Sequence, residues 1–227
     1  MRPDRLVLVC GTGTEVGKTW VSARLLVELR SRGRSVAARK PAQSFDVDHA
    51  GGQLGGATDA ERLGAASGEQ PDEVCRPLRS YRRAMAPPIA AEALGLPPFT
   101  VGDLVGELDW PASAVEVGLV ETAGGVRSPQ ADDGDACDLS AALRPDLVVL
   151  VADAGLGTIN SIRMSMDALA GTVGATPAVP VIVVLNRYDG HHEIHRRNHD
   201  WLASRDGYAL VTLPGGEQEL ADLVLGS

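Results

Sequence analysis

The sequence predicts a three-layer α/β fold with a mostly parallel central sheet. Short, almost wholly apolar runs alternate with amphipathic stretches along the chain. Runs that stay apolar at successive positions are typical of strands buried on both faces, and helices between such strands supply the crossovers of a parallel sheet. The chain has 227 residues and shows no internal repeat or linker. We therefore expect one domain over residues 1–227.

The expected elements follow from apolar periodicity and from turn residues. Strands are predicted at residues 6–10, 36–38, 115–120, 147–152, 179–185 and 209–213. Helices are predicted at residues 18–32, 59–66, 89–94, 101–108, 159–169, 193–204 and 217–225. The first helix places Val21, Leu25 and Leu29 on one face and is closed by Gly33. The Gly-rich stretch 50–57 is predicted to be a loop.

A glycine-rich turn joins the first strand to the first helix. Residues 11–19 read GTGTEVGKT. Backbone N–H groups of such a turn and the helix N-terminus bind phosphate, the lysine adds a full charge, and the threonine hydroxyl suits Mg²⁺. The spacing is one residue longer than the common form of this phosphate-binding loop, the P-loop. The predicted nucleotide contacts are Gly13, Thr14, Glu15, Val16, Gly17, Lys18 and Thr19.

Polar residues follow several other predicted strands. Lys40 and Ser44 come after the second strand, Glu121 directly follows the third, and Asp153 and Asn186 follow the next two. In open parallel sheets, ligands bind outside the carboxyl ends of the strands. We therefore expect these side chains to gather around one site beside the phosphate-binding loop.

Composition narrows the partners and the compartment. The net charge of −9 argues against binding of nucleic acid or of an anionic membrane. No apolar run approaches the ~20 residues that span a bilayer, and the N-terminus lacks the apolar segment of a signal peptide. The three cysteines are widely spaced, which implies neither a disulfide framework nor a structural zinc. We expect a cytoplasmic protein that binds neither nucleic acid nor membrane.

Taken together, these motifs resemble those of the ATP-dependent dethiobiotin synthetases, from residue 6 to about residue 220. Residues 11–19 are similar to the family's P-loop, 39–44 (RKPAQS) to its K-P-V-Q-[ST] segment, and 58–60 (TDA) to its acidic metal-site element. Residues 86–91 (APPIAA) are similar to its S-P-H-x-A-A stretch, 120–125 (VETAGG) to V-E-G-A-G-G, and 156–160 (LGTIN) to L-G-x-I-N.

The resemblance implies a P-loop NTPase fold and an ATP- and Mg²⁺-dependent ligase of biotin biosynthesis. In that family CO₂ adds to one amine of 7,8-diaminononanoate to give a carbamate. The carbamate attacks the γ-phosphate of ATP, which gives a carbamic-phosphoric anhydride. The second amine then closes the ring of dethiobiotin. Phosphoryl transfer of this kind depends mainly on positioning and charge neutralisation.

The resemblance also implies roles for particular residues. The residues at the reacting centre are Thr14, Lys18, Lys40 and Ser44. The magnesium ligands are Thr19, Asp59 and Glu121, and the adenine contacts are Asn186 and Pro214. The substrate contacts are Ser44, Glu121, Gly124, Gly157, Thr158, Ile159 and Asn160. The last four open a helix that the partner subunit contributes in the family, where it holds the substrate's tail carboxylate, so a homodimer with shared active sites is implied.

Three positions depart from the family pattern. Gly13 stands where the family often has aspartate, Pro88 replaces a histidine, and Thr122 stands where the family has glycine. A side chain at position 122 would narrow the space beside the substrate. A related P-loop ligase or kinase that acts on another amine or carboxylate is therefore an alternative. A ParA- or MinD-type ATPase switch is another, although no lysine precedes Lys18 in the loop.

Two further segments invite metal hypotheses. His191, His192, His195 and His199 include an i, i+4 pair, and residues 132–135 read DDGD. No catalytic motif surrounds the histidines, and the acidic stretch lacks the terminal glutamate of a calcium loop. We expect a solvated helix and a solvated loop, respectively.

Overall fold

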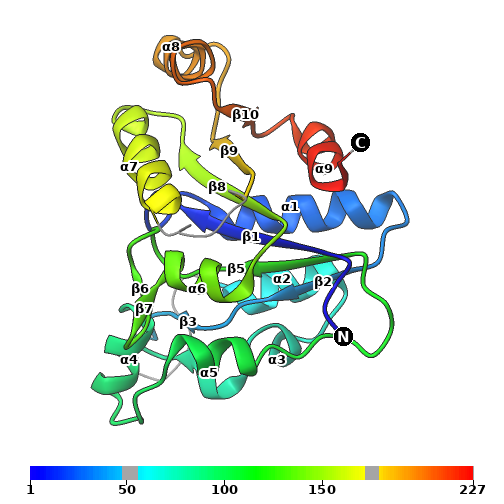
Figure 1. The fold of residues 1–227 in the computed structure, drawn as a ribbon, viewed down its shortest axis with the longest axis vertical. Coiled ribbons are helices and arrows are strands. Elements are labelled where there is room, and N and C mark those ends of the chain that lie inside the picture. The colour runs from blue at the N-terminus through cyan, green and yellow to red at the C-terminus, as the bar shows by residue number, and fades with distance from the viewer. Residues whose placement is uncertain (48–55, 172–178, 227) are drawn as a thin grey trace.

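The computed structural model describes residues 1–47, 56–171 and 179–226. Its centre is a six-stranded sheet of order β10-β9-β8-β1-β5-β2, in which every pairing is parallel (Figure 1). The carboxyl ends of these strands therefore share one edge. The strands are β1 (Arg5–Gly11), β2 (Val36–Arg39), β5 (Val117–Glu121), β8 (Leu147–Asp153), β9 (Val181–Asn186) and β10 (Ala209–Thr212).

Helices cover both faces of the sheet, as predicted. Side chains of β1 alternate between two apolar clusters, with Val7 and Val9 in one and Leu6 and Leu8 in the other. The first cluster takes in α1 (Lys18–Ser31), α2 (Asp59–Ser67), α3 (Pro71–Val74) and α9 (Glu217–Leu225). The second takes in α4 (Pro87–Ala93), α5 (Val101–Gly106), α6 (Ala136–Leu143) and α7 (Thr158–Gly171).

Several short elements were not predicted. They are the parallel pair β3 (Gln43–Ser44) and β4 (Ser80–Tyr81), the antiparallel pair β6 (Pro129–Ala131) and β7 (Gly134–Asp135), the short helices α3 and η1 (Pro77–Arg79), and α6. Strands of two or three residues are too short to show a period of two. The polar helix α8 (Glu193–Trp201) passes into a π-helical turn, η2 (Leu202–Asp206), instead of continuing to residue 204 as α-helix.

The acidic stretch 132–135 has a local structural role that the sequence did not indicate. Asp132 and Asp133 accept hydrogen bonds from the backbone N–H groups of Phe99 and Val101, at 2.9 and 2.7 Å. Asp135 caps α6. Asp132 and Asp133 are exposed and Asp135 is half-buried, and all three accept hydrogen bonds from backbone N–H groups. Most of the predicted loop 50–57 lies outside the described residues.

Within the part of the chain that the structure describes, no helix combines the length and the apolar character that a bilayer span needs.

Candidate active site

The phosphate-binding loop runs from the end of β1 to the start of α1. Gly17 has a φ of 93°, and a Cβ atom there would lie 2.1 Å from Nδ2 of Asn186, so the position requires glycine. The Lys18 Nζ atom donates to the carbonyl oxygen of Gly13 at 3.0 Å. The lysine side chain therefore folds back over the loop, where phosphate groups bind in P-loop proteins.

The ends of β8 and β9 hold this loop in shape. Asn186 Nδ2 donates to the carbonyl oxygen of Val16 at 2.9 Å. Arg187 donates to the carbonyl oxygen of Glu15 at 2.6 Å and forms an ion pair with Asp153 at 2.8 Å. Asn186 thus lies against the loop, as its place after a parallel strand predicted. Its predicted contact with adenine is a separate role, which these bonds do not test.

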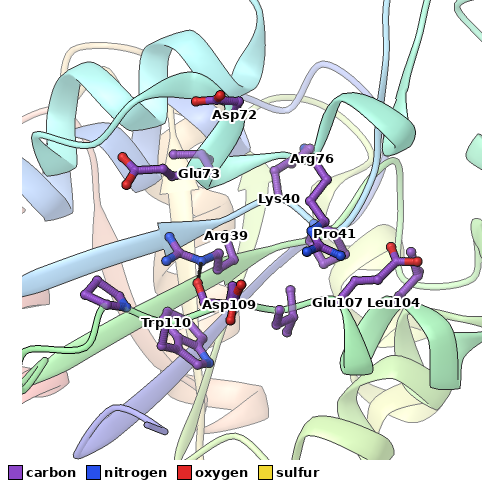
Figure 2. A pocket seen from close by; sticks show the side chains of 13 residues that line it. Arg39, Lys40, Pro41, Asp72, Glu73, Arg76, Leu104, Glu107, Asp109 and Trp110 are labelled. Carbon is purple, nitrogen blue, oxygen red and sulfur yellow. Dashed lines mark hydrogen bonds between the residues drawn. The ribbon is translucent and has the colours of Figure 1, made fainter.

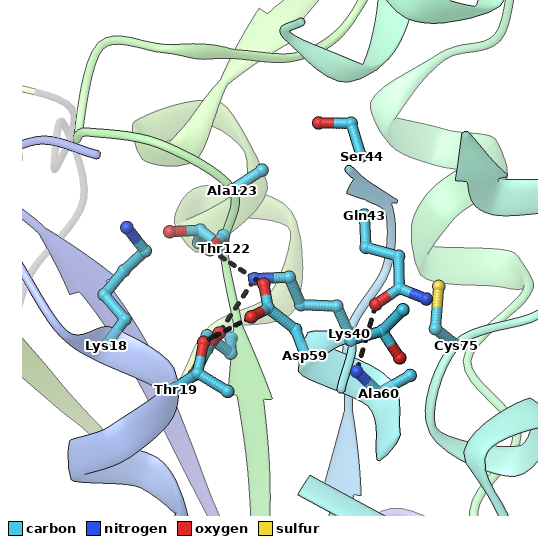
Figure 3. Close-up of polar contacts among 12 residues, drawn as sticks. Lys18, Thr19, Lys40, Gln43, Ser44, Asp59, Ala60, Cys75, Thr122 and Ala123 are labelled. Atoms are coloured by element: carbon cyan, nitrogen blue, oxygen red, sulfur yellow. Dashed lines mark hydrogen bonds and ion pairs between the residues drawn. The ribbon is translucent and has the colours of Figure 1, made fainter. Parts of the chain in front are cut away.

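Lys40 forms ion pairs with both carboxylates that were predicted to bind metal, and Figure 3 shows it beside Asp59 and Thr122. Its Nζ atom is 2.8 Å from Glu121 Oε1 and 2.8 Å from Asp59 Oδ2. The Thr19 hydroxyl is 2.7 Å from Asp59 Oδ1 and 2.8 Å from Glu121 Oε1. Lys40 and the three predicted metal ligands therefore converge, although they come from α1, α2 and the ends of β2 and β5.

Burial and charge shift the ionisation of this cluster. Burial lowers the pKa of Lys18 to about 8, with help from the positive charge of Lys40. Burial also acts to lower the pKa of Lys40, but Asp59 and Glu121 outweigh it, and the pKa rises above its usual value. The charge of Lys40 in turn lowers the pKa of Asp59 to about 2. Lys40 is thus held as a cation, whereas Lys18 is a buried cation that an anion would stabilise.

The same cluster fits a magnesium ion. Thr19, Asp59 and Glu121 offer hard oxygen ligands. The two carboxylates already bind one cation, the Lys40 ammonium. Over residues 1–47, 56–171 and 179–226, no group of three or more His, Cys, Asp or Glu side chains is placed to hold a metal. Two carboxylates and a hydroxyl match Mg²⁺, which usually completes its octahedron with phosphate oxygens and water.

The remaining predicted substrate residues surround the loop more loosely. Ser44 donates to the carbonyl oxygen of Met85 at 2.6 Å. Gly124 has a φ of 63° and lies beside Thr14. Pro214 lies in the turn after β10.

A cavity of about 570 Å³ separates the loop from α7. Thr14 and Asn160 both line it within one chain. Gly157, Thr158 and Ile159 form the start of α7, as predicted, and Gly157 has a φ of 91°. The partner subunit that the sequence implied for this helix start is not tested by a single chain.

Comparison with known proteins places the chain in a family. A family model described as an AAA domain matches residues 5–211. An ATP-dependent dethiobiotin synthetase of Rhodococcus erythropolis is 35% identical over 231 aligned residues, which cover 98% of this chain and 96% of the relative. Another, from Caulobacter sp. strain K31, is 36% identical and covers 97% of this chain and 94% of the relative. The chain belongs to the ATP-dependent dethiobiotin synthetase family.

Membership in the dethiobiotin synthetase family confirms the expectation of an ATP-dependent ligase, of the class that forms C–N bonds. Among solved structures, a plasmid partition protein from Borrelia burgdorferi is similar, with a TM-score of 0.56 and 11% identity, over 99% of this chain and 97% of that one. A likeness at such low identity concerns the fold alone. It confirms the predicted P-loop NTPase fold and gives no support to the switch alternative.

Sequence reasoning missed three residues that support this candidate site, and Ser22 is the first. Ser22 donates to Glu121 Oε2 at 2.6 Å, inside the protein. Ser22 lies three residues after Thr19 on α1, so both hydroxyls face the same way. The helical spacing from Thr19 could have identified it.

Arg39 is a second missed residue, and it anchors the strand end that carries Lys40 (Figure 2). Its guanidinium pairs with Glu69 at 2.7 Å, donates to the carbonyl oxygen of Asp109 and stacks 5.0 Å from the Trp110 ring centroid. Arg39 and Trp110 line a cavity of about 370 Å³. Lys40 directly follows the end of β2 and lines the same cavity, so these contacts of Arg39 fix the chain where Lys40 begins.

Gln43 is a third. Its Oε1 atom accepts from the Ala60 backbone N–H at 3.0 Å, and its Nε2 atom donates to Ser80 Oγ at 2.9 Å. It therefore ties β3 and β4 to the first turn of α2. That turn is further fixed by a capping box of Thr58 and Glu61. Asp59 is thereby held facing Lys40.

Proposed function

We propose that this chain is a dethiobiotin synthetase that uses ATP, Mg²⁺ and CO₂ to carboxylate 7,8-diaminononanoate and close its ureido ring. The observation that carries the proposal is the position of the Lys40 ammonium, between Asp59 and Glu121 and beside Thr19. A second lysine, Lys18, lies on the phosphate-binding loop. Two lysines and two carboxylates at the end of a P-loop suit the transfer of a phosphoryl group to an anionic acceptor.

The loop binds the nucleotide. Backbone N–H groups of residues 13–19 surround the phosphates, and Lys18 neutralises them. Because burial makes the charged form of Lys18 unfavourable, the incoming phosphates relieve that penalty. When bound, Mg²⁺ would neutralise charge between the β- and γ-phosphates, and Thr19, Asp59 and Glu121 would hold it.

Lys40 orients the acceptor. Its pKa is raised, so it stays an ammonium donor and does not act as a base. An ammonium on a flexible stem can leave the carboxylates for a carbamate oxygen placed beside Lys18. Holding the carbamate oxygen in line with the phosphoryl group is the main contribution that a protein makes to such a transfer.

The substrate extends away from the loop in this proposal. Thr14 and Ser44 contact the diamine, and Gly124 lets the backbone approach it. The start of α7, Gly157 to Asn160, is a helix N-terminus, and the backbone N–H groups at such an end suit the tail carboxylate. The partner subunit of a homodimer supplies this helix start.

A coupled assay tests the proposal. Phosphate release from Mg-ATP with bicarbonate is measured with and without 7,8-diaminononanoate, while dethiobiotin is followed by mass spectrometry. We expect phosphate, ADP and dethiobiotin in equal amounts, and none of them from Lys18→Ala. ATP turnover that other amines stimulate, but 7,8-diaminononanoate does not, would instead support a related ligase with another substrate.

A further inference from the structure

Thr122 carries a hydroxyl that the folded chain does not use. The residue directly follows Glu121 and is fully buried. Its backbone is fixed at both ends, since its N–H donates to the Val9 carbonyl at 3.0 Å and its carbonyl accepts from Lys40 Nζ at 3.1 Å. Its Oγ1 atom has no hydrogen-bond partner among the described residues. Figure 3 shows the hydroxyl pointing toward the side where the Lys18 ammonium lies.

A buried hydroxyl without a hydrogen-bond partner is unfavourable for folding. It has lost its bonds to water and gained none in the protein, and a valine of the same shape would avoid this loss. In the part of the chain that the structure describes, three buried side-chain polar atoms have no partner: Arg5 Nε, Thr122 Oγ1 and Thr158 Oγ1. Arg5 opens β1, far from the carboxyl ends of the strands. Thr122 alone of the three touches the Lys40 cluster.

The surroundings of this hydroxyl indicate its ligand. Lys40 contacts the carbonyl of Thr122 itself, and Lys18 lies on the neighbouring loop. Two ammonium groups attract an oxyanion, and a hydroxyl between them can donate one hydrogen bond to it. The family pattern has glycine at this position, so the donor is an addition of this chain.

We propose that Thr122 is a further substrate-binding residue, whose hydroxyl donates a hydrogen bond to an oxyanion held between Lys18 and Lys40. The oxyanion is a carbamate oxygen or an oxygen of the transferring phosphoryl group, and this assignment rests on the proposed function. Lys40 covers the backbone of Thr122 in the ligand-free chain. When Lys40 moves toward the anion, it releases this carbonyl contact.

Three variants separate this role from a structural one. Thr122→Val removes the donor and keeps the shape, Thr122→Ser keeps the donor, and Thr122→Gly restores the family residue. We expect Thr122→Val to be at least as stable as the natural chain without ligands. Its diamine-dependent kcat/KM should fall about 10- to 100-fold, the effect of a hydrogen bond to a charged group. Thr122→Ser should retain most of the activity.

Thermal protection by ligands identifies the oxyanion. Protection by MgADP with aluminium fluoride, a mimic of the transferring phosphoryl group, is compared with protection by 7,8-diaminononanoate and bicarbonate. If Thr122→Val loses protection by MgADP with aluminium fluoride, the hydroxyl binds the phosphoryl group. If it loses only the protection by 7,8-diaminononanoate and bicarbonate, the hydroxyl binds the carbamate.

Other outcomes overturn the assignment. Unchanged activity and protection in Thr122→Val would show that the hydroxyl contacts no substrate. A loss of stability in that variant would show a structural role instead. Failure of the natural chain to make dethiobiotin would reject the proposed function, and the aluminium fluoride comparison would still decide whether Thr122 contacts the phosphoryl group.

Discussion

Lys40 and Glu121 form an ion pair of 2.8 Å, with side chains that are 2% and 0% exposed. Charges removed from water this completely are stable only when they are paired and hydrogen-bonded. Glu121 meets this condition through Lys40, Thr19 and Ser22. A second carboxylate, Asp59, shares the same ammonium at the more exposed side of the cluster. In the ligand-free site, one ammonium group of the chain thus balances part of the charge of two carboxylates.

Replacing that cation should reveal a site for a divalent ion. Lys40→Met leaves two carboxylates facing each other without a positive partner, and we expect a loss of about 3 kcal/mol in unfolding free energy. Added Mg²⁺ should raise the melting temperature of Lys40→Met more than that of the natural chain. Denaturant unfolding and thermal scans with and without Mg²⁺ measure both effects. Equal stabilisation of the two proteins by Mg²⁺ would argue against the carboxylates as ligands.

A matched control uses an ion pair at the surface. Arg34 pairs with Glu116 at 2.8 Å, and both side chains are well exposed. Because exposed pairs contribute little, Arg34→Met should leave stability and its response to Mg²⁺ almost unchanged.

Acid should weaken the fold partly through Asp59. Its pKa is lowered from 3.8 to about 2 in the folded chain, chiefly by the charge of Lys40. A carboxyl with a depressed folded-state pKa contributes stability above its unfolded pKa and loses it as the pH falls toward the folded value. Between pH 3.8 and about 2, Asp59→Asn should therefore lose less stability than the natural chain. Denaturant titrations in metal-free buffer measure the difference, and parallel slopes for the two proteins would contradict it.

Nucleotide binding should take up protons in mildly alkaline solution. The pKa of Lys18 is lowered to about 8, first by burial and then by Lys40. Above that pH the free protein has lost this proton, and bound phosphates bring it back. We expect calorimetry of ADP binding in buffers of different ionisation enthalpy to show uptake that grows from pH 7 to 9. Lys18→Arg should bind without uptake, because a guanidinium stays charged throughout this range. Identical uptake in that variant would assign the proton to another group.

The sequence predicted where the main side chains gather, and the reason is topological. Lys40, Glu121 and Asn186 each follow an apolar run, and parallel strands bring their carboxyl ends to one edge. What it could not predict depends on side-chain packing between distant segments. The pairing of β3 with β4, which joins Gln43 to Ser80, has only two residues in each strand, too few to show an alternation of apolar and polar residues. The unpaired hydroxyl of Thr122 follows from the groups around it and has no sequence signature.

Substitution of Asn186 tests whether a residue that is predicted to contact the base also shapes the phosphate-binding loop. Its Nδ2 atom bonds Val16 at 2.9 Å and would clash with any side chain at Gly17. Asn186→Ala removes this bond, and we expect weaker binding of ATP, GTP and inorganic tripolyphosphate alike, by about 5- to 10-fold, as for the loss of one neutral hydrogen bond. Any further loss confined to ATP would measure recognition of adenine. Tripolyphosphate has no base, so its affinity separates the two roles in a single titration series. If Asn186→Ala binds tripolyphosphate as tightly as the natural chain does, the bond to Val16 does not support phosphate binding by the loop.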